Sequence, residues 1–284
     1  MLPREEYIEQ AFFFRSLAER MNRDVPTQDL LDSLGQEILA TTNLPTAIEF
    51  MASVMRHSGG FAPAMEKLSH YFTPFQTYVV TEAESDRSRF DFNVAVEVLH
   101  REASYRAEGP SPQGIFLFQF ETICRNRLGY FKGLTAMAGD PVYDEAWREF
   151  LLSIRAHVGV IDIADLLYLR SQHFATRHAL RAAGQAGEDP TLPPVLFGEK
   201  EGQIALANRR KDPLLLFAAL QRHLNYPLVP KPKRIDESKQ VIPMLVRRME
   251  RLEGRLKLLE EESRGGIDIT KFYKEEGGTM KEES

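Results

Sequence analysis

The chain has 284 residues, of which 43% are hydrophobic and 27% are charged, and its formal net charge is −5. This composition excludes disorder of the whole chain, and no apolar run approaches the roughly 20 residues of a membrane-spanning helix. Cys124 is the only cysteine, which excludes an internal disulfide and a cysteine-based zinc site. Because no signal-peptide pattern opens the sequence, we expect a cytoplasmic protein.

Four dipeptides that join a helix-capping residue to a proline predict where helices begin. They are Thr73-Pro74, Ser111-Pro112, Asp140-Pro141 and Asp212-Pro213. A Ser, Thr or Asp oxygen accepts hydrogen bonds from the first amides of a helix, and proline is tolerated at the first helical position. Apolar residues at helical spacing follow each dipeptide, which favours a helix over a plain turn. Gln76 completes a capping box with Thr73.

The same periodicity predicts the remaining helices of the N-terminal part. We expect helices over residues 3–21, 27–40, 45–56 and 62–72, over 74–108 with a break at 84–88, over 140–158 and over 162–183. The helix over 112–128 differs, because its apolar residues surround most of its circumference, which is typical of a helix buried on all sides. Its polar residues Gln119, Glu121, Arg125 and Asn126 therefore need partners inside the fold.

One segment has the pattern of a β-hairpin. Two short apolar runs, at residues 195–197 and 204–206, flank a loop with a glycine at each end, Gly198 and Gly202. We therefore predict a predominantly α protein: a multi-helix globular bundle over residues 1–226, with one small β-hairpin at about 195–207. No internal repeat at a spacing of 30–50 residues supports a helical solenoid.

The composition changes after Tyr226. A proline-rich linker is expected over residues 227–240, followed by a short coiled-coil helix over 241–263. The coiled coil is indicated by six apolar residues spaced three and four apart, at the a and d positions of a heptad. They are Ile242, Leu245, Met249, Leu252, Leu256 and Leu259.

Charged residues beside this stripe favour self-association as a homodimer. With Ile242 at an a position, Arg248 and Arg255 occupy g positions, while Glu253 and Glu260 occupy e positions. In a parallel pair of helices, each g residue faces the e residue of the next heptad on the partner. The alternative is that the stripe packs against the protein's own body, which would not require complementary charges.

The last residues, 264–284, are expected to be a disordered tail. Within them, residues 267–273 alternate apolar and polar side chains before two aromatics, which would also suit a short segment that docks on a protein partner.

Two patterns indicate other chemistry. Glu97 and His100 lie three residues apart in a predicted helix, the spacing of ligands in helical-bundle metalloenzymes. One such pair is expected by chance in a chain with this many Glu and His residues, so we favour two solvated side chains and expect no cofactor. The sequence also lacks phosphate-binding glycine loops and a nucleophile elbow.

Basic clusters indicate nucleic-acid binding as a further alternative. Arg209, Arg210 and Lys211 precede a predicted helix, and residues 231–257 carry an excess of basic side chains. Such local charge suits phosphate contacts, but an acidic run at 260–262 follows at once, and a solvated helix face explains many charged runs. The preferred prediction is therefore a non-enzymatic, self-associating interaction or scaffolding protein.

Overall fold

The computed structural model describes residues 1–21, 27–85, 90–182 and 193–231, together with Met249 and Leu256. The described residues form thirteen α-helices and no strand, and residues 1–232 make one compact unit. The helices are α1 (Arg4–Arg20), α2 (Thr27–Glu37), α3 (Leu44–Ser58), α4 (Ala62–Lys67), α5 (Pro74–Glu84), α6 (Phe92–Ala107), α7 (Pro112–Asn126), α8 (Tyr130–Ala138), α9 (Glu145–His157), α10 (Ile163–Leu169), α11 (Gln172–Ala182), α12 (Glu199–Ala207) and α13 (Pro213–Leu224).

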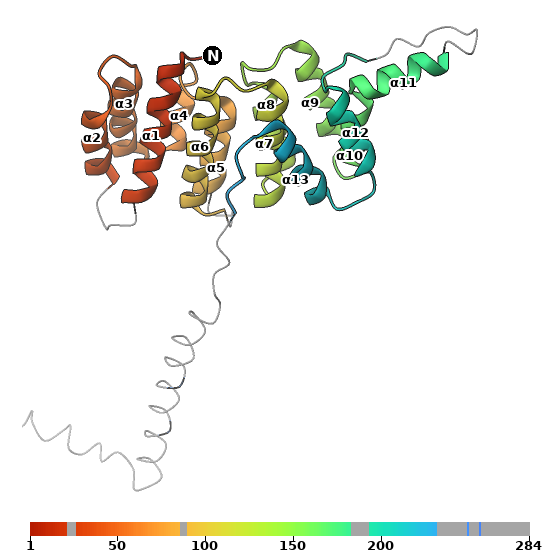
Figure 1. Cartoon of the computed structure of the whole chain (residues 1–284). Helices are drawn as coiled ribbons and strands as arrows, with labels where there is room; N and C mark the ends of the chain where they lie inside the picture. The colour runs from red at the N-terminus through yellow and green to blue at the C-terminus, as the bar shows by residue number, and fades with distance from the viewer. Residues whose placement is uncertain (22–26, 86–89, 183–192, 232–248, 250–255, 257–284) are drawn as a thin grey trace, which may run out of the picture. The chain divides into compact units, whose positions relative to one another are not determined.

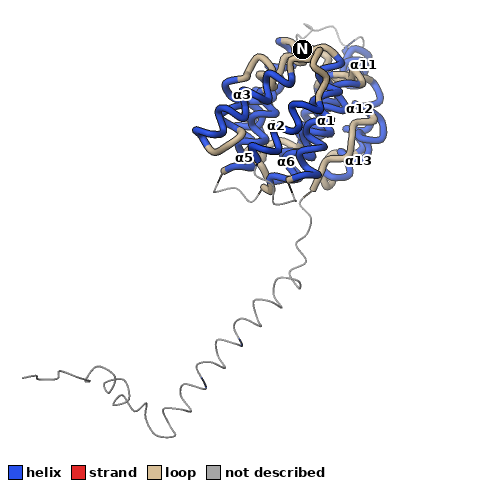
Figure 2. The backbone as a smooth tube through the Cα atoms, turned by 90° about the vertical axis from the view of Figure 1, so that its left-hand side faces the viewer, coloured by secondary structure: helices blue, strands red, loops and turns tan. Residues whose placement is uncertain are grey.

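Within the compact unit the helices stand side by side. Figure 1 shows them following one another from α2 and α3 at one end to α11 and α12 at the other. The most extensive contacts are those of α1 with α6, α2 with α3, α8 with α9 and α10 with α12. Figure 2 draws the described residues of the unit as helix and loop only. The prediction of a predominantly α-helical protein is therefore confirmed.

Helix α7 is the buried helix that the sequence predicts. Eleven of its fifteen residues are buried, and it packs against α6, α8 and α13. The ring of Phe116 lies 5.5 Å from that of Trp147 and 5.7 Å from that of Phe150, measured between centroids. Aromatic pairs at this separation add stabilisation beyond the apolar area that they bury. This cluster forms the centre of the fold.

The polar residues of α7 all find partners inside the unit, as expected. Gln119 donates to Glu102 and Asp140 and accepts from Tyr143. Glu121 pairs with Arg125, four residues later, and Asn126 donates to the carbonyl oxygens of Thr122 and Pro230. Buried polar groups without such partners would lose their hydration without compensation.

Three of the four predicted caps are confirmed. Thr73 forms the complete capping box with Gln76, Ser111 accepts from the amide of Gly114, and Asp212 accepts from the amide of Leu214. Each begins a helix whose first residue is the proline that follows it.

The fourth predicted cap, Asp140, is wrong. Helix α9 begins at Glu145, and Asp144 caps it by accepting from the amide of Trp147 at 2.9 Å. Asp140 is fully buried and pairs with Arg106. A buried guanidinium requires a negative partner, and this requirement determines the role of Asp140.

The predicted β-hairpin at 195–207 is also wrong. Only the first run is extended, where Phe197 forms an isolated parallel bridge with Ser171, and α12 occupies the rest. Gly198 is the N-cap of α12, and Glu199 and Glu201 in its first turn favour the positive end of the helix dipole. Gly202 allows close helix packing, because a Cβ there would lie 2.3 Å from the Ser171 hydroxyl oxygen.

Two further helices differ from the sequence prediction. Helix α8, over Tyr130–Ala138, was not predicted, and the predicted helix over 162–183 is divided into α10 and α11 at Arg170–Ser171. Beyond α13, Tyr226 and Val229 are buried, so the first residues after the predicted boundary at 226 pack on the helical body.

Candidate interaction surface

A groove of about 360 Å³ lies between α7, α8, α10, α13 and the segment that joins α9 to α10. Its walls are formed by aromatic and aliphatic side chains. They include Phe120, Tyr130, Ile154, Val158, Val160, Ile161, Ile163, Leu166, Pro213 and Phe217. The groove is therefore mainly apolar.

Several apolar side chains at this groove are exposed. Val160 is 83% exposed, and Ile161 and Tyr130 are each 38% exposed. Exposed apolar side chains that gather around a concavity are typical of protein-interaction sites.

The polar groups of the groove have contacts of their own. The Tyr130 hydroxyl lies 3.5 Å from the Cys124 sulfur. Burial raises the pKa of the Cys124 thiol to about 11, so this thiol is protonated at neutral pH and is a weak nucleophile. The Asp162 carboxylate accepts from the backbone amides of Ala164 and Arg210. These contacts position the α9–α10 segment.

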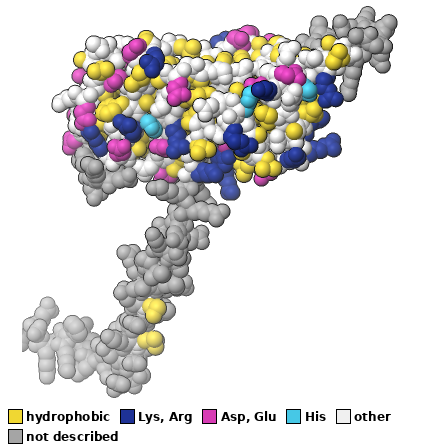
Figure 3. All heavy atoms as spheres, viewed as in Figure 1, with side chains coloured by type: hydrophobic (Ala, Val, Ile, Leu, Met, Phe, Trp, Pro, Cys, Tyr) yellow, Lys and Arg dark blue, Asp and Glu magenta, His cyan; other side chains and the backbone are white. Residues whose placement is uncertain are grey.

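The residues predicted to contact nucleic acid are Arg209, Arg210 and Lys211. They lie between α12 and α13, shortly before the groove residue Pro213 in the sequence. Arg209 pairs with Asp165, and its guanidinium lies 5.7 Å from the centre of the Tyr168 ring. Arg210 and Lys211 are exposed. On the face seen in Figure 3, basic side chains are most numerous along the lower edge of the body. The second basic cluster, 231–257, lies outside the described residues except for Lys231, Met249 and Leu256.

The predicted metal residues Glu97 and His100 both lie on α6, and each contacts a protein group. The Glu97 carboxylate pairs with Arg101 at 2.7 Å, and His100 Nδ1 lies 2.9 Å from the carbonyl oxygen of Ala11 on α1. In the part of the chain that the structure describes, no group of three or more His, Cys, Asp or Glu side chains is placed to hold a metal ion.

Two of the predicted self-association residues are described, Met249 and Leu256. Both are helical and are 59% and 58% exposed. The other predicted contacts of the coiled coil lie outside the described residues. They are Ile242, Leu245, Arg248, Leu252, Glu253, Arg255, Leu259 and Glu260. The predicted tail over 264–284 and its segment 267–273 also lie outside them.

No family model, curated protein or solved structure matches this chain. None of the helices that the structure describes has the length and apolar content needed to cross a lipid bilayer. The groove residues were not predicted from the sequence. The apolar run around Gly159, from Val158 to Ile161, is the signal that would have pointed to them, because such a run in a loop exposes apolar side chains.

Proposed function

We propose that the protein is a non-enzymatic interaction protein that self-associates through its C-terminal heptad pattern. One observation carries the proposal: Met249 and Leu256, at successive a positions of the pattern, are both helical and both more than half exposed in the single chain. A second helix that covers large apolar side chains seven residues apart removes them from water, which stabilises the pair of helices.

The energetics support an interface with more than one part. Burying a side chain of this size stabilises an association by about 1.5–3 kcal/mol, but a coiled coil of two to three heptads is marginal when alone. The apolar groove beside Val160 gives the helical body a second surface that a protein partner could cover. A scaffolding role would combine the two surfaces, since one surface joins copies of the chain and the other contacts a protein partner.

The proposal is tested by sedimentation velocity of the full chain over a range of concentrations. We expect the wild-type mass to rise with concentration, whereas Met249→Glu combined with Leu256→Glu keeps the chain monomeric. The matched control is Lys257→Glu, which lowers the net charge by the same two units at a b position, on the outer face of the predicted coil. A wild-type chain that is monomeric at every concentration would contradict the proposal.

A further inference from the structure

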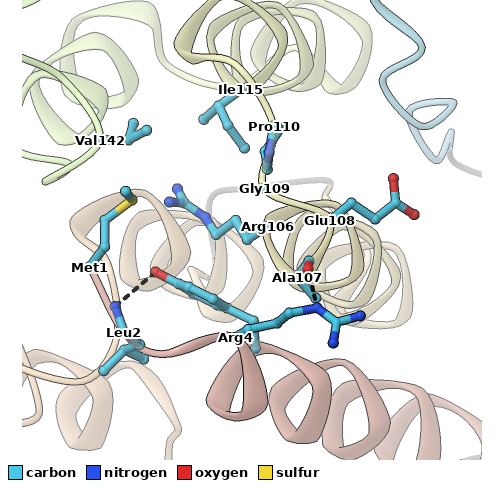
Figure 4. A pocket seen from close by; sticks show the side chains of 11 residues that line it. Met1, Leu2, Arg4, Arg106, Ala107, Glu108, Gly109, Pro110, Ile115 and Val142 are labelled. Carbon is cyan, nitrogen blue, oxygen red and sulfur yellow. Dashed lines mark hydrogen bonds between the residues drawn. The ribbon is translucent and has the colours of Figure 1, made fainter.

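A second pocket, of about 300 Å³, lies where the start of α1, the end of α6 and the start of α7 meet (Figure 4). Its walls are mainly apolar, with Leu2, Pro110, Ile115 and Val142 among the lining residues. The volume is at the lower end of the range for small-molecule sites, roughly 300–1,000 Å³. The pocket shares no lining residue with the groove beside Val160.

One buried cation lines this apolar pocket. The Arg106 side chain is 3% exposed, and Figure 4 shows its guanidinium pointing toward the space between Met1 and Val142. The Tyr7 ring supports it, with 5.9 Å between the Arg106 guanidinium carbon and the ring centre. A buried guanidinium at the wall of an apolar pocket is a strong hydrogen-bond donor that solvent barely reaches.

Arg106 keeps unused donors. A guanidinium has five N–H bonds. Nη2 donates to Glu102 at 2.9 Å and to Asp140, and Nη1 donates to Asp140 at 3.4 Å. Nε has no hydrogen-bond partner among the described residues. These contacts leave the Nε–H and one Nη1–H without an acceptor in the described part of the chain; the Nε atom is covered by protein, so the Nη1–H is the donor that a ligand could use. A ligand oxygen would supply the missing acceptor.

The surrounding charges disfavour a ligand with two negative charges. Asp140 and Glu102 lie within hydrogen-bond distance of Arg106, so a phosphate dianion there would face two nearby carboxyl groups. Arg4 borders the pocket, but its Nε donates to the carbonyl oxygen of Ala107 at 3.0 Å, and Figure 4 shows its guanidinium turned toward that oxygen. Arginine and a carboxylate form a charge-assisted pair with favourable geometry.

We propose that this pocket binds a small aliphatic monocarboxylate. The carboxylate accepts a hydrogen bond from the guanidinium of Arg106, and the aliphatic body contacts the partly exposed Leu2, Pro110 and Val142. This binding is a property of the body of the chain and does not depend on self-association.

The test is isothermal titration of the full chain with hexanoate, and with hexan-1-ol as a neutral molecule of similar length. We expect hexanoate to bind and hexan-1-ol to bind at least tenfold more weakly. Replacing Arg106 directly leaves Asp140 buried without its partner, so the informative variant is Val142→Trp, which fills the pocket from the partly exposed α8–α9 segment. The same substitution at exposed Val160 is the matched control.

Val142→Trp should weaken hexanoate binding at least tenfold while its melting temperature stays at the wild-type value, and Val160→Trp should bind as the wild type does. Absence of hexanoate binding at millimolar concentration would overturn the proposal. Equal binding of hexanoate and hexan-1-ol, or undiminished binding by Val142→Trp, would overturn it as well.

Discussion

The guanidinium of Arg106, near the end of α6, pairs with the carboxylate of Asp140 between α8 and α9, and both side chains are buried. Gln119 on α7 donates to the same Asp140 carboxylate at 3.1 Å. This polar cluster therefore connects three consecutive parts of the helical body. It also places Arg106 at the wall of the pocket described above.

Removal of the Asp140 charge should destabilise the chain. Asp140→Asn keeps the size of the side chain but leaves the buried Arg106 without its closest anion, and we expect a loss of about 3 kcal/mol in the free energy of unfolding. Chemical denaturation measures this difference. The control is Glu145→Gln, because Glu145 pairs with Arg148 at 3.4 Å on the surface and should change stability by less than about 1 kcal/mol. Equal effects of the two substitutions would contradict the role given to Asp140.

Glu102 makes stability depend on pH. Burial raises the pKa of the Glu102 carboxyl above its ordinary value of 4.5; the positive charge of Arg106 opposes this effect, and the negative charge of Asp140 adds to it. The folded chain therefore holds this proton more tightly than the unfolded chain does. The resulting stabilisation is complete below pH 4.5 and is lost as the pH rises through the folded pKa.

The neutral variant Glu102→Gln should lack this pH dependence, because it has no proton to lose. Its stability relative to the wild type should increase as the pH is raised from 4.5 to 8, measured by denaturation at a series of pH values. A relative stability that falls over this range would show that the ionised Glu102 carboxylate is the favoured form.

Tyr226 secures the chain that follows α13. Its hydroxyl lies 2.7 Å from Glu121 Oε2 and 3.1 Å from the carbonyl oxygen of Phe217, and the residue is fully buried. Tyr226→Phe should cost about 1.5–3 kcal/mol in the free energy of unfolding, since the lost bond reaches a carboxylate. Tyr130→Phe is the matched control and should cost less than about 1 kcal/mol, because sulfur is a weak acceptor. A cost as small at Tyr226 as at Tyr130 would argue against this anchoring role.

Local signals in the sequence predicted much of the fold. The caps at Thr73, Ser111 and Asp212 depend on contacts within three residues, so the local sequence is sufficient to predict them. The burial of α7 follows from apolar residues around its whole circumference. A cap depends only on residues near it in the sequence. A helix that is apolar on all sides is buried whichever element packs against it.

The wrong predictions arise where contacts between residues far apart in the sequence determine the local structure. Asp140 has the sequence of a helix cap, but its partner Arg106 lies 34 residues earlier in the chain. Gly202 has the sequence of a turn, but it lies where α12 meets Ser171. Helix α8 also contains a close approach, because a Cβ on Gly133 would lie 2.6 Å from Ile123 Cδ1. Such packing requirements cannot be read from periodicity.

The candidate sites were predictable only in part. The heptad at residues 242–259 is a one-dimensional pattern, so the sequence alone indicates it, and it stays a prediction. The groove beside Val160 and the pocket at Arg106 are assembled from residues far apart in the chain. No spacing in the sequence brings Tyr130 to Phe217 or Leu2 to Val142.

The most direct test of the proposed self-association uses charge reversal. One variant carries Arg248→Glu and Arg255→Glu, and the other carries Glu253→Arg and Glu260→Arg. In a parallel coil, each variant alone brings like charges together across the interface, whereas an equimolar mixture restores every opposite-charge pair.

Sedimentation equilibrium of the two full-length variants, separately and mixed, gives the result. The parallel coil predicts that each variant alone associates more weakly than the wild type and that the mixture recovers the wild-type association. Variants that associate like the wild type on their own, or a mixture no stronger than its components, would contradict it.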